Sequence, residues 1–492
     1  MGWSEVGESL PIVGREPQIK LVEASLLTLW QEKYHEPTPL LLYFYGMRGI
    51  GKTRLLESVA AKVQSELPGP GFLSLFINSS TSLPRLSENA QFRPLEEIDA
   101  FFNEFYRQFK LAGQPTQPSY NLAEYERLLL NRSYLKNEDG LWLRARTLAG
   151  DLARLHREQG LRLLILQDNV PSKVFQWLSK FFYKDLLIEG VLAVVATGYS
   201  PPVVSTLSLL AYFKSLPLQA LQAEEARQLL GAGKLPFAVE NELIEMAAGH
   251  PASLLEGWHE IVAMQLKNQD APAFFDESGD FTLAGQARLA KVMAEALLQN
   301  IPSVLARCCR LIAPLRLFRY DTLAAFLPPL MPEEAKYGRA SVVDFMLLGK
   351  ELNDQIDFIA SDKAYIMHPL ARTILSNETR FTQPEKFRQL NEAAANYYGR
   401  LIERLEKPEQ RSEAILEELY HRLLLAHFTV GLEQETVTSV SYEAIRTLQQ
   451  HLPRLVGRED KRRLISLLQR DPDFGRLFPN ETAGLLQLLD EV

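Results

Sequence analysis

The octapeptide GMRGIGKT at residues 46–53 follows an apolar run at 40–45 and precedes a helical pattern at 54–60. It has the form G-x-x-x-x-G-K-[ST] between a buried strand and a helix, which is typical of a phosphate-binding loop. Its glycines let backbone N–H groups surround phosphates, and the start of the helix adds partial positive charge. Lys52 is expected to reach the β- and γ-phosphates, and the Thr53 hydroxyl to ligate Mg²⁺. The chain is therefore predicted to bind a nucleoside di- or triphosphate. A glycine-rich turn without a ligand is the alternative.

The composition is that of a globular protein of several domains. The chain has 492 residues, of which 46% are hydrophobic and 23% charged, and this length predicts about two to four domains. No apolar run approaches the roughly 20 residues of a membrane span. Residues 1–6 lack the basic and apolar regions of a signal peptide and the Ser or Thr of a myristoylation signal. We therefore expect a cytoplasmic protein without a membrane partner.

Charge and cysteine usage argue against a generally basic nucleic-acid-binding protein and against a cysteine metal or redox site. The formal net charge of −8 gives no overall basic surface for nucleic acid, although a local basic face is left open. Cys308 and Cys309, the only cysteines, are adjacent within an apolar helical pattern, so a mutual disulfide would be strained. Both are expected to be reduced thiols rather than a metal or redox site.

Strand and helix patterns alternate through the first part of the chain. Short apolar runs bounded by polar turns lie at 40–45, 72–77, 161–166 and 191–196, with a weaker one at 216–221. The long interval 79–160 contains helical patterns, one of them with phenylalanines at 101, 102 and 105. This alternation predicts an α/β fold with a mainly parallel sheet and helices on both faces, as in P-loop NTPases.

Helical patterns dominate from Ala223 onward. A helical segment that ends near Lys267 precedes a polar linker at 268–285, and a second helical unit begins at Arg288. This unit ends in a predicted β-hairpin of residues 355–359 and 364–367, and three helices followed by a hairpin form a winged-helix pattern. The predicted domains are a P-loop α/β domain at 1–222, a helical lid with linker at 223–287, a winged-helix domain at 288–380 and an α-helical region at 381–492.

Phosphoryl-transfer sites need a carboxylate at the end of a neighbouring strand to hold the metal, and a second one to activate water. The candidate strand runs into Gln167, Asp168 and Asn169. If it ends at Leu166, Gln167 takes the metal side and Asp168 the base position. A shift of one residue gives Asp168 the metal and leaves Asn169 as a partner that cannot act as a base. Either register lacks one carboxylate, and a plain turn aspartate is the alternative.

The order of these motifs resembles the STAND class of P-loop ATPases, which is related to AAA+ ATPases, includes the NB-ARC and NACHT groups and has a bacterial type. The resemblance covers roughly residues 10 to 430. It rests on residues 12–16 as the VGRE segment, 46–53 as Walker A, Gln167-Asp168 as the end of Walker B, 194–200 as the sensor 1 strand, 217–230 as the entry into the lid, Gly249-His250-Pro251 as the G-x-P motif, and 365–372 as the M-H-D region.

The resemblance implies a site for ATP or ADP with Mg²⁺. Through it, Val13, Gly14 and Arg15 contact adenine and ribose, Pro251 lies against the adenine, and His368 touches the β-phosphate of ADP. The other nucleotide-binding residues are Gly46, Arg48, Gly49, Ile50, Gly51, Lys52, Thr53 and Arg54. The implied catalytic residues are Gln167, Asp168 and Thr197, and the implied metal ligands are Thr53 and Asp168.

Three positions depart from the family's pattern. Tyr199 stands where the sensor strand usually ends in arginine, Gln167 stands where Walker B has aspartate, and Pro369 replaces the aspartate of M-H-D. Because arginine and a second carboxylate supply charge to the γ-phosphate and the metal, their absence indicates slow ATP hydrolysis or binding alone. Arg48 or Arg15 could replace the missing charge. His368 could instead cap a helix.

The first function to consider is a nucleotide-controlled switch in which ADP holds the chain closed and exchange to ATP exposes an assembly surface. The resemblance implies signal transduction in bacterial antiviral defence, programmed death or transcriptional control. Effector and sensor are then expected on a separate partner protein or on a longer form of this chain, and assembly into a homo-oligomer is the alternative to such a partner.

The second function is a DNA-binding transcriptional regulator. Its presumed recognition helix at 341–350 is apolar and acidic, whereas base and phosphate contacts favour Arg, Lys, Asn or Gln. Nucleic acid is therefore not expected as a partner. The third function is a nucleotide-stabilised scaffold that barely hydrolyses ATP. The trigger, the partner and the oligomeric state do not follow from the sequence.

Overall fold

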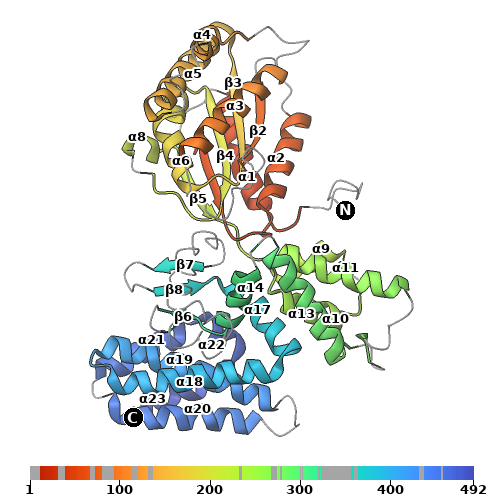
Figure 1. Ribbon diagram of the computed structural model, residues 1–492, viewed down its shortest axis with the longest axis vertical. Helices are drawn as coiled ribbons and strands as arrows, with labels where there is room; N and C mark the ends of the chain where they lie inside the picture. The colour runs from red at the N-terminus through yellow and green to blue at the C-terminus, as the bar shows by residue number, and fades with distance from the viewer. Residues whose placement is uncertain are drawn as a thin grey trace. The chain divides into compact units, whose positions relative to one another are not determined.

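The computed structural model describes most of the chain as two compact units (Figure 1). The described residues are 12–31, 39–66, 72–79, 94–112, 120–130, 137–204, 206–231, 235–267, 274–276, 280–299, 301, 303–319, 322, 356–359, 364–430, 437–455 and 458–491. Those up to Trp258 belong to the first unit and those from His259 onward to the second. The four domains predicted from the sequence divide the chain more finely, and their boundaries stay a prediction.

A five-stranded parallel sheet forms the centre of the first unit. Its strands are β1 Leu41–Tyr45, β2 Phe72–Asn78, β3 Arg162–Asp168, β4 Leu192–Gly198 and β5 Phe213–Pro217, in the order β2-β3-β4-β1-β5. All four strand pairs are parallel, so each connection must cross over the sheet, and the helical patterns between the apolar runs provide these crossovers. The predicted parallel α/β sheet of P-loop NTPase type is confirmed.

The position predicted for the fifth strand overlaps the observed strand at two residues only. The sequence pattern favoured 216–221, but β5 ends at Pro217 and begins at Phe213. β5 lies at the edge of the sheet and is only partly buried, so polar Lys214 and Ser215 fit there although they interrupt an apolar run. Leu218 and Leu221 are buried because the connection after the strand packs inward.

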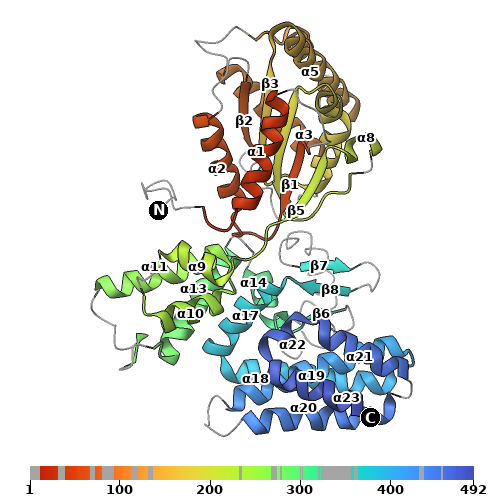
Figure 2. The same ribbon diagram turned by 180° about the vertical axis from the view of Figure 1, so that it is seen from behind.

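Helices cover both faces of the sheet, which is why β4 is buried along its whole length. α1 Glu16–Gln31 and α2 Lys52–Glu66 lie on the face seen in front in Figure 2. The opposite face carries α3 Pro94–Ala112, α5 Glu138–Gln159, α6 Ser172–Leu178, the π-helical turn η3 Ser179–Tyr183 and α7 Lys184–Ile188. The remaining helices of this unit are α4 Ala123–Leu129, α8 Leu207–Leu210, α9 Ala223–Leu230, α10 Phe237–Ala247 and the first part of α11 Pro251–Lys267.

An aromatic layer fills the space between the sheet and the helices of the α3 face. Its buried rings, with neighbouring centroids 5.4 to 6.4 Å apart, are Phe101, Phe102, Phe105, Phe175, Phe182 and Tyr183. Three of them come from the helix that the phenylalanine spacing predicted. Burial of large rings is the main favourable term that holds this layer.

The second unit is helical apart from a small sheet. Its elements are α13 Leu283–Leu298, α14 Ser303–Ile312, β6 Leu317–Phe318, β7 Ile356–Ile359, β8 Ala364–Met367, α17 Pro369–Thr382, α18 Pro384–Arg404, α19 Pro408–Val430, α20 Val437–His451, η5 Leu452–Arg454, α21 Arg458–Arg470, α22 Pro472–Leu477 and α23 Pro479–Glu491. The predicted all-helical C-terminal region is thus confirmed for the described residues.

The predicted β-hairpin is also confirmed. β7 pairs with β8 in antiparallel register, from Ile356 opposite Met367 to Ile359 opposite Ala364, and β6 adds a third strand that the sequence did not reveal. The helical pattern after Tyr320 and the presumed recognition helix at 341–350 lie outside the described residues, apart from Thr322. The winged-helix assignment therefore stays a prediction. α13 begins at Leu283, inside the stretch expected to be a linker.

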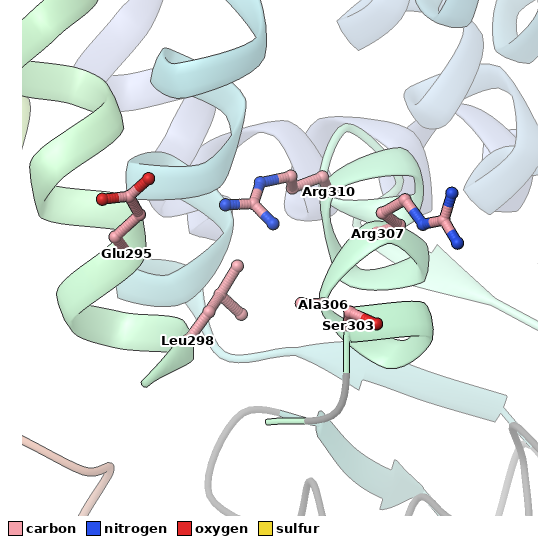
Figure 3. Close-up of a pocket in the computed structure, with 6 residues that line it drawn as sticks. All are labelled: Glu295, Leu298, Ser303, Ala306, Arg307 and Arg310. Carbon is pink, nitrogen blue, oxygen red and sulfur yellow. The ribbon is translucent and has the colours of Figure 1, made fainter. Parts of the chain in front are cut away.

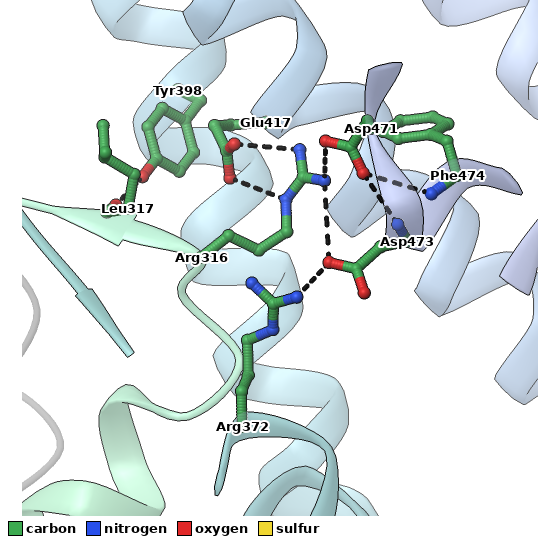
Figure 4. Close-up of polar contacts among 8 residues, drawn as sticks. All are labelled: Arg316, Leu317, Arg372, Tyr398, Glu417, Asp471, Asp473 and Phe474. Carbon is green, nitrogen blue, oxygen red and sulfur yellow. Dashed lines mark hydrogen bonds and ion pairs between the residues drawn. The ribbon is translucent and has the colours of Figure 1, made fainter. Parts of the chain in front are cut away.

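A buried ionic cluster joins three helices and a loop of the second unit (Figure 4). Arg316 donates to Glu417 on α19 over 2.9 Å and to Asp471 before α22 over 2.5 Å, and Arg372 on α17 is paired with Asp473. Burial by itself would lower the pKa of Arg316, but the carboxylates of Glu417 and Asp471 outweigh it and raise that pKa. Residues more than 90 positions apart in sequence are thus held by charge as well as by packing.

Among the helices of the described residues, none combines the length and the hydropathy needed to span a bilayer. Cys308 and Cys309 lie buried on α14, the helix that the apolar pattern predicted, and are not joined in a disulfide.

Candidate functional site

The candidate site lies at the carboxyl edge of the sheet, where β1, β3 and β4 end. β1 stands between β4 and β5 with Phe44 opposite Thr197, and β3 stands beside β4 with Gln167 opposite Ala196. The chain leaves β1 toward α2 on one face, while the helices after β3 cover the other face. Ligands of open α/β sheets bind where the connections diverge in this way.

The phosphate loop has the backbone conformation that its glycines predicted. Gly49 and Gly51 have φ of +77° and +101°, which side chains with a Cβ rarely adopt. A Cβ on Gly49 would also lie 2.7 Å from the His250 ring and 2.8 Å from the Ala252 Cβ. α2 begins directly after Gly51 at Lys52, so its first N–H groups face the loop.

Lys52 is held inside the loop. Its Nζ donates to the carbonyls of Gly46 over 2.8 Å and Met47 over 3.0 Å, and it lies 4.4 Å from the centroid of the Tyr199 ring. The side chain is buried, with 6% of the residue exposed. Tyr199, which replaces the arginine expected at the end of the sensor strand, therefore contributes the face of an aromatic ring next to the lysine rather than a second positive charge.

Asp168 is the centre of a hydroxyl–carboxylate cluster. Thr53 donates to its Oδ2 over 2.7 Å and Thr197 donates to its Oδ1 over 2.6 Å. The Asn169 amide donates to Oδ2 over 3.2 Å, and the Asn169 backbone N–H donates to the Thr197 hydroxyl over 3.1 Å. Asp168 and Thr197 are fully buried. The structure thus brings together Thr53, Asp168 and Thr197, three of the residues that the sequence singled out.

The structure shows where the strand ends, which the sequence left open. β3 ends at Asp168, whose carboxylate lies next to Thr53, and Asn169 takes the following position with φ of +53°. Gln167 is not part of the cluster. Its Oε1 accepts a hydrogen bond of 2.9 Å from Tyr183 in the aromatic layer on the other face. Alternation along the strand explains this, because neighbouring side chains point to opposite faces.

The VGRE segment contacts the loop through Arg15. Its guanidinium donates to the carbonyls of Gly14, Ile50 and Gln219 over 3.0, 2.8 and 2.8 Å. Burial lowers the pKa of Arg15, and Glu225 and Glu16 oppose that shift. Three of its five N–H donors bond carbonyls, so Arg15 braces the segments around the loop, and its replacement of the missing sensor arginine stays a prediction.

The other residues expected to bind nucleotide surround the loop. Val13 is partly buried beside Gly14, and Pro251 is the first residue of α11. Arg54 is half exposed on α2 and donates to Glu57 over 3.0 Å. Arg48 contributes its backbone carbonyl to a contact with His250, described next, and its side chain is partly exposed.

His250, to which the sequence gave no role beyond its place in the G-x-P motif, contacts the phosphate loop. It is 1% exposed, and its Nε2 lies 2.7 Å from the Arg48 carbonyl. Because a carbonyl only accepts, Nε2 carries the proton, and Nδ1 accepts from the N–H of Ser253 over 3.3 Å. No local pattern could have revealed this contact, since the two residues are 202 positions apart.

His368 belongs to the second unit. It is the N-cap of α17, where its Nδ1 accepts from the N–H of Leu370 over 3.3 Å, so it takes the capping role that was the alternative. Burial lowers its pKa, and the nearby Arg372 adds to the shift. Its expected contact with the β-phosphate stays a prediction.

A hollow of about 340 Å³ lies between α13 and α14 of the second unit (Figure 3). Its lining residues are Glu295, Leu298, Ser303, Ala306, Arg307 and Arg310. The Arg310 guanidinium is already paired with Glu378 over 2.6 Å. The hollow is a space between packed helices, and the phosphate loop remains the candidate site.

Comparison with known proteins adds remote likenesses only. No protein-family profile matches the chain, and no curated protein matches it. Similar solved structures include Cdc6p from Pyrobaculum aerophilum, 14% identical with a TM-score of 0.38, covering 78% of this chain and 97% of that one. The Aeropyrum pernix ORC1 protein, solved in complex with DNA, is 12% identical with a TM-score of 0.39, covering 76% and 95%.

A STAND protein with a tetratricopeptide repeat sensor from Pyrococcus horikoshii is 13% identical with a TM-score of 0.30, covering 100% of this chain and 66% of that one. Since all three TM-scores lie below 0.5, these likenesses carry no argument about function. Function has to be argued from the site itself.

Proposed function

We propose that the chain is an ATP- and ADP-binding signalling switch that hydrolyses ATP slowly or not at all. The observation that carries the proposal is the Asp168 carboxylate between the hydroxyls of Thr53 and Thr197, directly beside the phosphate loop. A strand-end carboxylate next to the threonine of the loop is the arrangement that binds Mg²⁺ and phosphate together.

The residues present fit a nucleotide with Mg²⁺. Magnesium prefers hard oxygen ligands and shares them with substrate phosphates, and Thr53 Oγ1 and Asp168 Oδ2 are such oxygens, 2.7 Å apart. When bound, Mg²⁺ neutralises phosphate charge. Lys52 would hold the β- and γ-phosphates, and the first N–H groups of α2 would add to their binding. Val13, Gly14, Arg15 and Pro251 are proposed to line the adenosine side.

The weakness of hydrolysis follows from the residue after Asp168. General bases that activate water are usually carboxylates or histidines, whereas Asn169 cannot take a proton. Gln167 is bonded to Tyr183 on the other face, and Tyr199 offers no positive charge to the γ-phosphate. The site therefore keeps the groups that bind phosphate and lacks those that cleave it.

A protein that binds nucleotide and hydrolyses it slowly is suited to switching. The di- and triphosphate forms must each favour one conformation, and about 5.5 kcal/mol of differential affinity moves a population from 1:99 to 99:1. Assembly with a partner protein or with further copies of the chain, a winged-helix domain and a role in bacterial defence or regulation belong to this proposal through the family resemblance. Nucleic acid is not included as a partner.

Nucleotide identity and turnover test the proposal. Mass spectrometry of the nucleotide that co-purifies with the chain should find ADP or ATP, and GDP would overturn the adenine assignment. Lys52→Ala should lose nucleotide binding, because it removes the buried cation of the loop. Lys62→Ala is the matched control, since Lys62 lies on the same helix in a half-exposed pair with Glu23.

A multiple-turnover ATPase assay separates a slow enzyme from a binding protein. Turnover of the wild type equal to that of Lys52→Ala supports binding alone, and turnover above it supports slow hydrolysis. Size-exclusion profiles with ATP and with ADP test the switch, and identical monomer profiles would count against assembly.

A further inference from the structure

The outer side of the phosphate loop is held by contacts to three successive carbonyls. The Arg48 carbonyl accepts from His250 Nε2 over 2.7 Å, the Gly49 carbonyl from the N–H of Ala252 over 3.3 Å, and the Ile50 carbonyl from the Arg15 guanidinium over 2.8 Å. We name these three contacts the carbonyl clamp. Two of the three come from the start of α11.

The clamp determines where the loop's N–H groups point. In a planar trans peptide the C=O of one residue and the N–H of the next point in opposite directions. With the carbonyls of residues 48, 49 and 50 directed outward to the clamp, the N–H groups of Gly49, Ile50 and Gly51 are directed to the inner side. The Ile50 N–H donates to the Met47 carbonyl over 3.4 Å, and Lys52 donates to the same carbonyl, so this N–H points to the side of the loop where the lysine lies.

Inward N–H groups form the anion-binding concavity of such loops. We propose that His250 is a positioning residue for this concavity: its Nε2–H fixes the peptide between Arg48 and Gly49 and thereby couples the phosphates to the first turn of α11. The inference rests on the proposed nucleotide site, and it adds a residue and a mechanical link to that site.

Burial and fit support a positioning role. The imidazole is almost fully buried, and its two nitrogens have different partners, the Arg48 carbonyl and the Ser253 amide and hydroxyl. Gly49 has no side chain where the ring and Ala252 approach it. A phosphate that draws the Gly49 N–H inward pulls on the same peptide whose carbonyl His250 holds, so the displacement passes to α11.

The test uses a matched pair of variants at one position. His250→Gln retains an N–H donor at about the place of Nε2, and His250→Met has nearly the same shape without a donor. Titration with ADP and with AMP measures binding with and without the β-phosphate. The methionine variant should bind ADP roughly tenfold more weakly, the order expected for one lost buried hydrogen bond, and AMP no more than about twofold more weakly. The glutamine variant should restore most of the ADP affinity.

A second readout does not depend on nucleotide. Hydrogen–deuterium exchange of residues 249–256 in nucleotide-free protein reports two amides. The N–H of Ala252 donates to the Gly49 carbonyl, and the N–H of Ser253 donates to His250 Nδ1. His250→Met should exchange faster there than His250→Gln, whereas Lys52→Ala should exchange like the wild type. If the wild type binds no ADP, the proposed function is overturned. The exchange rates of His250→Met and His250→Gln then remain as the test of the clamp. Equal exchange and equal ADP affinity in the two variants would overturn the clamp.

Discussion

At Asn169 the backbone is left-handed, with φ of +53°, and the side-chain amide donates to Asp168 over 3.2 Å. Asparagine tolerates this conformation better than most residues. In the proposed nucleotide site it also stands where a carboxylate could take a proton from the attacking water. Under that proposal, an amide at this position leaves phosphate binding without a general base.

Asn169→Glu is therefore expected to raise ATP turnover at least about tenfold, because a positioned general base contributes roughly 10²- to 10⁴-fold and the strained backbone lowers that gain. Asn169→Gln is the control of equal length without a base. Steady-state phosphate release at saturating Mg–ATP measures both. Equal turnover in the two variants would show that the missing carboxylate does not limit hydrolysis.

The sequence alone identified the loop, Thr53, Asp168 and Thr197, because each belongs to a motif whose spacing is local. It could not show on which face of the sheet Gln167 lies, since an apolar run does not show at which residue the hydrogen bonding between strands ends. Pairing of Asn78 with Asp168 extends β3 two residues past Leu166 and turns Gln167 to Tyr183. Nor could it find the role of His250, whose partner is far away in sequence.

At the scale of the elements, the ionic cluster around Arg316 ties the loop before β6 to three helices, α17, α19 and α22. Arg316→Met should lower the free energy of unfolding by about 3 to 5 kcal/mol, because buried carboxylates lose their counter-charge. Arg388→Met is the control: its pairs with Glu385 and Glu392 are exposed and should contribute little to stability. Urea denaturation followed by circular dichroism compares them, and equal losses would contradict the role of the cluster.

The packing of α18 on α19 is expected to be sensitive to acid through His421. This ring is fully buried, with Nδ1 2.9 Å from Asn391 Oδ1, and burial first, then Arg316 and Arg372, lowers its pKa to about 3. The unfolded side chain has a pKa of about 6.5. The neutral ring therefore contributes stability that is complete above pH 6.5 and is lost as the pH falls toward 3, by up to about 5 kcal/mol.

His421→Leu removes this titration. It should be less stable than the wild type at pH 7.5, since Asn391 loses a partner, yet its stability should fall less between pH 7 and 4.5. His259→Gln, at an exposed position on α11, should follow the wild type. Urea midpoints measured by circular dichroism at several pH values test this prediction. Parallel curves of midpoint against pH for His421→Leu and the wild type would refute the role of His421 in acid sensitivity.

At the scale of the whole molecule, the two compact units carry different reporters. All five tryptophans precede residue 259, so tryptophan fluorescence follows the first unit, whereas circular dichroism follows the helices of both. The sequence predicted the sheet, the hairpin and the helical tail because their patterns are periodic. It missed the exact edge strand and the short β6, which pair through backbone groups and need no apolar run.

Mg–ADP at about 100 times its dissociation constant should stabilise the first unit by about 2.7 kcal/mol and raise its fluorescence-monitored melting temperature by roughly 5 to 10 °C. Melting at pH 7.5 with and without nucleotide, read by both signals, measures this shift. Lys52→Ala should abolish it, and Lys62→Ala should keep it. If the units unfold separately, the second unit will give a circular-dichroism transition that has no counterpart in tryptophan fluorescence. The melting temperature of that transition should not change when ADP is added. A shift of equal size in every component would mean that the two units unfold as one, because only the first contains the phosphate loop.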